Sequence, residues 1–156
     1  MQTEFEIQRA TLAPSIPDDA QFRRWINAVL STQDHDCSLT IRLVDEAEAR
    51  RFNKAYRERD YATNVLSFPA DLPEGLPVEL RQAQLGDILI CAPVVAREAR
   101  EQNRSEVDHW AHLTIHGVLH LLGYDHEQPD EAAIMEALET KILNGLGVSD
   151  PYIDIS

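Results

Sequence analysis

The chain has few cysteines, few basic residues and no long apolar run. Its two cysteines, Cys37 and Cys91, are far apart and outside any CxxC spacing, which argues against a disulfide framework and against a thiolate metal site. No segment approaches the roughly 20 apolar residues of a membrane span, and acidic residues stand in the N-terminal segment where a signal peptide has a basic region. We therefore expect a cytoplasmic protein without a membrane partner.

The sequence of 156 residues shows no repeat, low-complexity tract or linker, so we expect one domain over residues 1–156. Apolar runs predict strands at about 3–10, 38–44, 64–68 and 87–92. Helical periodicity predicts a helix capped by Asp18 or Asp19 and a helix over about 45–56 capped by Asp45. It also predicts helices over about 93–103, 105–122 and 130–145, the second of which opens with a capping box at Ser105. The expected fold is α+β: a small mixed β-sheet of about four strands packed with about five helices, with the helix at 105–122 in the centre.

Acidic residues dominate the charge: 14 Lys and Arg against 27 Asp and Glu give a net charge of −13, which opposes contact with a polyanion such as RNA. The basic residues are nevertheless concentrated, because a stretch of 18 residues contains Arg42, Arg50, Arg51, Lys54, Arg57 and Arg59. This stretch either forms a basic face or pairs with nearby carboxylates such as Asp45, Glu46 and Glu48. Charge alone favours the paired arrangement.

Residues 116–126, HGVLHLLGYDH, have the spacing of a metal site. Residues i and i+4 are neighbours on one face of a helix, so His116 and His120 can bind the same ion. Gly123 can adopt a left-handed conformation and end the helix, which lets His126 reach that ion from the following loop. Three neutral nitrogens leave one tetrahedral position of zinc for water, which is the catalytic rather than the structural pattern. The motif predicts that His116, His120 and His126 bind a metal ion.

The identity of the metal and the roles of two neighbouring residues are less constrained. Imidazole ligands suit zinc best, although nickel, copper or iron would also bind them. His112 lies one turn before His116 and is expected to hydrogen-bond a ligand or the core rather than bind the ion. Asp125 either accepts a hydrogen bond that fixes the tautomer of a ligand or simply completes the turn before His126.

Gly117 stands where HExxH metalloproteases carry the glutamate that acts as general base. The spacing HxxxHxxGxx(H) otherwise matches the metzincin proteases. A zinc metalloprotease-like hydrolase therefore stays an alternative, but its base would have to come from elsewhere in the chain.

Together with NKAYR at 53–57 and TNVLSFP at 63–69, the histidine motif resembles the YbeY family of bacterial endoribonucleases. The segments LGDILI at 85–90 and HWAH at 109–112 extend the resemblance from about Thr40 to Tyr152. The resemblance implies a metal-dependent endoribonuclease, specific for single-stranded RNA, that acts in ribosomal RNA maturation, including 3′-end processing of small-subunit RNA, and in ribosome quality control.

The same resemblance implies a set of residues and partners. His116, His120 and His126 would be the zinc ligands, and Arg57 and His116 would be catalytic residues. Ribosomal RNA, ribosomal proteins or an assembly GTPase would be partners, whereas DNA would not. A ribosome-assembly factor with a purely structural metal is a further alternative, which the open fourth coordination position argues against.

The expected site is a cleft between the helix at 105–122 and the strand that carries TNVLSFP. The guanidinium of Arg57 would match two phosphate oxygens. A zinc ion would lower the pKa of its bound water to about 7 and polarise a phosphoryl oxygen. The Pro-rich stretch 69–84 is expected to be a mobile loop that could gate this cleft.

Overall fold

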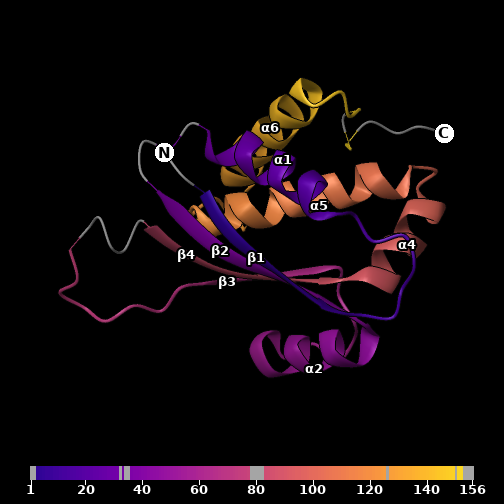
Figure 1. Ribbon diagram of the computed structural model, residues 1–156, viewed down its shortest axis with the longest axis horizontal. Helices are drawn as coiled ribbons and strands as arrows, with labels where there is room; N and C mark the ends of the chain where they lie inside the picture. Colours follow the sequence, from indigo (N-terminus) through magenta and orange to yellow (C-terminus); the bar gives the residue numbers. More distant parts are fainter. Residues whose placement is uncertain are drawn as a thin grey trace.

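The computed structural model describes residues 3–31, 33, 36–77, 83–125, 127–149 and 151–152. In these residues a four-stranded sheet is flanked by five helices (Figure 1). The strands are β1 (Thr3–Ala10), β2 (Cys37–Val44), β3 (Val65–Pro69) and β4 (Gln84–Cys91). The helices are α1 (Asp19–Leu30), α2 (Glu46–Arg57), α4 (Ala92–Glu101), α5 (Glu106–Leu121) and α6 (Pro129–Gly145). The predicted α+β fold is confirmed.

The sheet is mixed and has the strand order β1-β2-β4-β3. β1, β2 and β4 run parallel, and β3 lies antiparallel to β4 at the edge, with Ser67 opposite Ile88. Parallel neighbours need a long crossover rather than a tight turn, so α1 stands between β1 and β2 in the chain. The edge position of β3 brings it against α5, where the Ser67 hydroxyl donates to the Gly117 carbonyl at 3.3 Å.

Helices α1, α5 and α6 lie on one side of the sheet, and α2 lies on the other (Figure 1). The larger core joins α1, α5 and α6 to the first face, whereas Ala49 of α2 packs against Leu66 and Leu89 on the second. Helix α5 is central, as predicted, because ten of its 16 residues are buried. Its polar side chains must therefore find partners inside the protein or line a cavity. None of the described helices has the length and apolarity needed to cross a membrane.

Local capping signals account for two helix starts. The Asp18 carboxylate accepts from the Gln21 N–H at 2.9 Å, and the Gln21 side chain accepts from the Asp18 N–H at 3.0 Å, which completes a capping box for α1. The Ser105 hydroxyl accepts from the Asp108 N–H at 3.1 Å at the start of α5. The sequence thus predicted the first residue of the helix that carries the histidines.

Asp45 occupies the predicted N-cap position of α2, but its side chain does not cap the helix. Its carboxylate instead accepts from the Thr11 hydroxyl and, at 3.2 Å, from the Leu12 N–H. The predicted cap was wrong in this respect because the loop after β1 supplies donors that are remote in sequence. Helix α2 ends at Arg57, as expected, because Glu58 takes a left-handed φ of 57°.

Candidate active site

A cavity of about 330 Å³ lies between α5, β3 and the loop that follows α2. Helix α5 contributes His116 and His120, whose ring centroids are 5.4 Å apart, as expected for residues one turn apart. The cavity lies where the sequence predicted it, between this helix and the strand that carries TNVLSFP. Eight further described residues line it: Asn53, Arg57, Arg59, Tyr61, Thr63, Asn64, Val65 and Ser67.

Arg57 and Arg59 both line this cavity, and neither has a carboxylate partner among the described residues. Two other arginines of the basic stretch form ion pairs, Arg42 with Glu48 at 2.5 Å and Arg50 with Asp60 at 2.6 Å. The pairing that charge alone favoured is therefore correct for those two residues and wrong for Arg57. The cavity keeps two permanent positive charges in a protein whose net charge is −13.

The loop after α2 is held in place by Asn53, which is buried. The Asn53 side chain donates from Nδ2 to the Tyr61 carbonyl at 2.9 Å, and the Asn53 carbonyl accepts from the Arg59 N–H at 3.3 Å. These bonds fix the backbone on which Arg59 and Tyr61 stand. The Tyr61 side chain is 51% exposed at the cavity, so its ring is accessible to a ligand.

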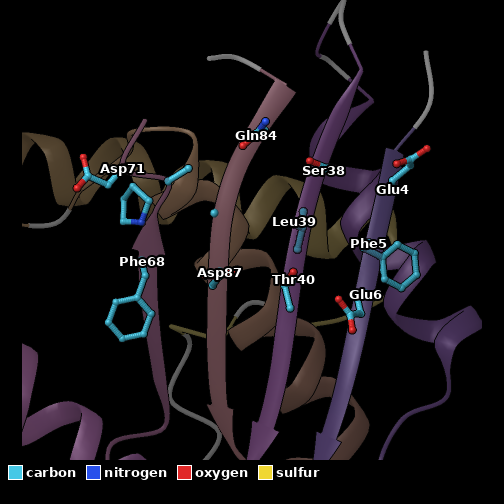
Figure 2. A pocket seen from close by; sticks show the side chains of 13 residues that line it. Glu4, Phe5, Glu6, Ser38, Leu39, Thr40, Phe68, Asp71, Gln84 and Asp87 are labelled. Carbon is cyan, nitrogen blue, oxygen red and sulfur yellow. The ribbon is translucent and has the colours of Figure 1, made fainter. Parts of the chain in front are cut away.

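A second, open hollow of about 730 Å³ lies over the starts of β1, β2 and β4 (Figure 2). It carries the carboxylates of Glu4, Glu6 and Asp87, and its described lining contains no basic residue. Such a surface repels phosphate, so the smaller histidine cavity is the candidate active site. The stretch 69–71 of the predicted gating loop lines this hollow, and residues 78–82 lie outside the described residues. The described part of the loop does not line the histidine cavity, and its predicted gating role stays a prediction.

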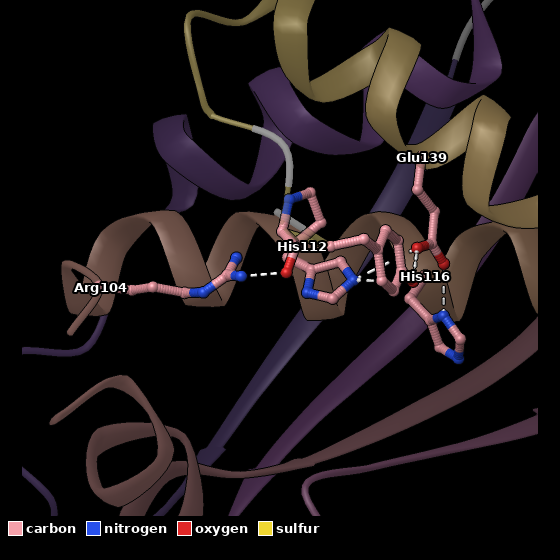
Figure 3. Close-up of polar contacts among 6 residues, drawn as sticks. Arg104, His112, His116 and Glu139 are labelled. Atoms are coloured by element: carbon pink, nitrogen blue, oxygen red, sulfur yellow. Dashed lines mark hydrogen bonds and ion pairs between the residues drawn. The ribbon is translucent and has the colours of Figure 1, made fainter. Parts of the chain in front are cut away.

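Behind the cavity, Glu139 of α6 meets two histidines of α5 (Figure 3). Its Oε1 lies 2.5 Å from His116 Nδ1, and its Oε2 lies 3.2 Å from His112 Nε2. The Tyr152 hydroxyl also donates to Oε2. Burial raises the pKa of the Glu139 carboxyl, but the hydrogen bonds from His112, His116 and Tyr152 outweigh this effect and lower the pKa to about 2. Glu139 is therefore an ionised, fully buried carboxylate.

His112, His116 and Glu139 form a group whose donor atoms lie within 4.8 Å of one another and can hold a metal ion. Sequence reasoning identified the two histidines and missed Glu139. A signal was available: Met135, Glu139 and Leu143 recur at i, i+4 and i+8, so this acid stands within the apolar stripe of α6. The role predicted for His112, a hydrogen bond to a ligand or the core, stays a prediction.

A separate polar network lies near the start of α5. The side chain of His109, which is 4% exposed, places Nε2 2.8 Å from Glu98 Oε1, and Asn64 Nδ2 donates to the same oxygen at 3.0 Å. Burial raises the pKa of the Glu98 carboxyl, but the hydrogen bonds from His109 and Asn64 outweigh it, and the pKa lies below its ordinary value. Because Asn64 lines the cavity, this network fixes one of its walls.

Comparison with known proteins assigns the chain to a family. The family described as Endoribonuclease YbeY matches residues 6–147. The protein belongs to the YbeY family. An Endoribonuclease YbeY of Pseudomonas entomophila is 59% identical over 97% of this chain and 94% of its own length. The Endoribonuclease YbeY of Alkalilimnicola ehrlichii is 59% identical over 88% of this chain and 82% of its own length.

The fold is also that of a solved structure. The solution structure of TM1509 from Thermotoga maritima superposes with a TM-score of 0.55, at 23% identity, over 94% of this chain and 99% of that protein. At this identity the likeness concerns the fold alone.

Gly117 of this YbeY protein cannot be replaced by the glutamate of an HExxH protease without rearrangement. A Cβ at this position would lie 3.0 Å from Ile88 Cγ2 on β4, so the residue faces the sheet at close range. Its carbonyl accepts the hydrogen bond from Ser67. A side chain at position 117 would therefore meet the core rather than the cavity, which argues against the protease alternative.

Gly123 ends the motif helix as expected, with a left-handed φ of 105°. His126, the third predicted ligand, lies outside the described residues. Asp125 is partly buried, and its predicted role beside His126 stays a prediction. The structure thus brings Arg57, His116 and His120 to one cavity.

Proposed function

We propose that this protein is a metal-dependent endoribonuclease that cuts single-stranded RNA in the histidine cavity. One observation carries the proposal: Arg57 and Arg59 line the same cavity as His116 and His120 and have no carboxylate partner among the described residues. A site for phosphate beside a site for a metal is what phosphodiester cleavage requires. Membership of the YbeY family, and the name endoribonuclease carried by the relatives, support the same reaction.

The donor set of the cavity fits a divalent transition metal. His116, His120 and His126 would hold the ion, with zinc preferred and nickel or another such metal as an alternative. When bound, the metal lowers the pKa of water and polarises a phosphoryl oxygen. The ring spacing of 5.4 Å between His116 and His120 is suitable for two ligands of one ion.

The basic and aromatic residues of the cavity would bind the RNA strand. The Arg57 guanidinium is permanently charged and planar, so it can hold two oxygens of the scissile phosphate, while Arg59 binds a neighbouring phosphate. The exposed Tyr61 ring offers a surface on which an unpaired base can stack. Bases in a duplex are stacked on each other and cannot reach this ring, which accounts for a preference for single strands.

The biological substrate would be ribosomal RNA, at a step of maturation such as 3′-end processing of the small-subunit RNA, with a further role in ribosome quality control. The resemblance of the motifs supports this substrate. The net charge of −13 opposes RNA binding in general, so it would confine RNA to the local basic site and weaken indiscriminate binding. Ribosomal proteins or an assembly GTPase would then supply recognition that the small basic site lacks.

The test compares zinc-loaded wild-type protein with Arg57→Ala on a labelled single-stranded RNA. Loss of one preorganised charge should lower turnover roughly 10²- to 10³-fold while zinc stays bound. Arg50→Ala is the matched control, because Arg50 is paired with Asp60 and does not line the cavity, and it should cleave at the wild-type rate. His116→Ala should abolish cleavage.

The products also identify the nucleophile. Attack by the adjacent 2′-hydroxyl leaves a cyclic phosphate end, whereas attack by water leaves a simple phosphate. If the wild-type protein binds ribosomal RNA but never cleaves it, or if Arg57→Ala and His116→Ala are as active as wild type, the nuclease assignment fails and the assembly-factor alternative replaces it.

A further inference from the structure

Glu139 is a carboxylate at a buried position of α6 where an apolar residue is expected. It is 0% exposed and lies between Met135 and Leu143 on the stripe that packs toward α5. Burying a charge is costly, and replacing a buried ionic group by an apolar residue of similar volume is often neutral or stabilising. Stability alone therefore does not explain this residue, and its contacts on α5 show what it does.

Its nearest contact is a ring nitrogen of a proposed metal ligand. Glu139 Oε1 lies 2.5 Å from His116 Nδ1, on the side of the ring away from Nε2 (Figure 3). Two ring nitrogens and the Tyr152 hydroxyl surround the carboxylate, so its oxygens act as acceptors and Nδ1 is the donor of this bond. In a neutral imidazole the lone pair then belongs to Nε2.

We propose that Glu139 is a positioning residue for the metal site: by accepting the Nδ1–H of His116 it fixes the tautomer and the orientation of that ring, so that Nε2 is the atom that binds metal. The inference rests on the proposed function in one respect, the assignment of His116 as a ligand. It explains why a chain that needs metal at the cavity keeps a charge on α6.

The geometry separates this role from that of a direct ligand. Two ligand atoms on one tetrahedral zinc, each about 2.0–2.2 Å from it, are more than about 3 Å apart. The 2.5 Å between Glu139 and His116 Nδ1 is shorter than that and is a direct hydrogen bond. Glu139 also does not line the cavity, whereas His116 and His120 do. The group of His112, His116 and Glu139 is thus a support behind the site.

The carboxylate itself is held by further donors. His112 Nε2 lies 3.2 Å from Oε2, and the Tyr152 hydroxyl donates to the same oxygen. Tyr152 is in turn placed by the preceding residue, because the Arg104 guanidinium donates to the Pro151 carbonyl (Figure 3). A turn near the end of the sequence thereby completes the surroundings of Glu139.

The experiment uses the full chain, stripped of metal and then titrated with zinc. In metal-free wild type, long-range ¹H–¹⁵N spectra of the imidazoles should show His116 protonated at Nδ1. Glu139→Met has similar length and no oxygen acceptor, so the His116 proton should distribute over both nitrogens and zinc affinity should fall roughly 10- to 100-fold. Glu139→Gln keeps one oxygen acceptor and should recover most of both properties.

Glu136→Met is the matched control, because Glu136 lies on the same helix and is exposed. It should leave the tautomer and the zinc affinity unchanged. Unaltered His116 protonation and zinc affinity in Glu139→Met would overturn the proposal. Loss of one zinc ligand in the X-ray absorption spectrum of Glu139→Gln would overturn it too, since it would make Glu139 a direct ligand.

If Glu139→Met does not fold, Tyr152→Phe decides the question. It removes one donor from Glu139, and the His116 Nδ1–H resonance should shift, whereas an unshifted resonance contradicts the coupling. None of these readouts involves RNA. A protein that binds zinc with a fixed His116 tautomer but never cleaves RNA would refute the proposed function and leave this inference standing.

Discussion

The histidines in the two halves of helix α5 have different surroundings. The exposed fraction of the side chain rises along one stripe of the helix, from 4% at His109 to 15% at His112 and 21% at His116. In the first half, His109 and His112 are hydrogen-bonded to Glu98 and Glu139. In the second half, His116 and His120 line the cavity.

This difference shows that spacing alone does not assign a role to a histidine. All four lie on the same stripe. Glu98 of α4 contacts His109, and Glu139 of α6 contacts both His112 and His116. Of these histidines, His116 and His120 line the cavity beside the loop after α2. A carboxylate holds an imidazole in one orientation, and an imidazole that also borders a cavity can bind a ligand with its other nitrogen. Changes on either side of this division should therefore have different consequences.

The largest effect is expected from His120→Ala. This change removes a proposed ligand on the cavity side, so elemental analysis after dialysis should find little bound zinc. His112→Ala removes a histidine from the other half and should keep most of the zinc, because His112 does not line the cavity. The reverse result, zinc kept by His120→Ala and lost by His112→Ala, would move the metal to the group behind the cavity.

Gly123→Val should weaken zinc binding while the helices persist. A β-branched residue at a φ of 105° is strained, at a cost of about 1–3 kcal/mol, and the strain can be relieved by moving the turn that leads to His126. Zinc affinity, measured by competition with a chelator, should fall before the circular dichroism of the helices changes. Gly75→Val is the control, since Gly75 has a φ of 89° in a loop away from the cavity. Equal zinc affinity in both variants would contradict the proposed geometry of the third ligand.

Tyr61→Ala should raise the KM for single-stranded RNA about tenfold, because stacking of one base on an aromatic ring contributes about 1–3 kcal/mol. Turnover at saturation should change little, since the ring does not contact the scissile phosphate in this proposal. Tyr56→Ala is the comparison, because Tyr56 is 65% exposed but does not line the cavity. A KM that is equal in both variants would remove Tyr61 from the RNA-binding surface.

The smallest effect is expected for the buried first half of α5, where a substitution should change the free energy of unfolding in a way that depends on pH. The pKa of Glu98 is lowered in the folded state, so its stabilisation is present above the ordinary value of 4.5 and is lost as the pH falls through the folded-state value. Glu98→Gln should lower the free energy of unfolding by about 1–2 kcal/mol at neutral pH and by less in acid. Urea titrations of both proteins at several pH values measure this difference, and a gap that widens below pH 4.5 would show that the sign is wrong.

Much of the fold followed from local patterns. Each predicted strand and helix is present, because alternating apolar residues and capping residues such as Asp18 act over a few neighbouring positions. The order of the strands in the sheet was not predicted. It depends on which strands meet across α1 and α2, and no short window of sequence contains that information.

The sequence by itself determined the chemistry of the cavity, since the spacing of His116 and His120 and the turn at Gly123 are local consequences of one helix and its end. Only the tertiary structure decided which charged side chains can bind a ligand and which are already paired or buried. Among the described residues Arg57 has no carboxylate partner, whereas Arg50, on the same helix, is paired with Asp60. Glu139 is buried although its helix is largely exposed. The reason is physical: whether a charged side chain is paired, and how strongly it attracts a ligand, depends on its neighbours, and those neighbours come from segments that are distant in the chain.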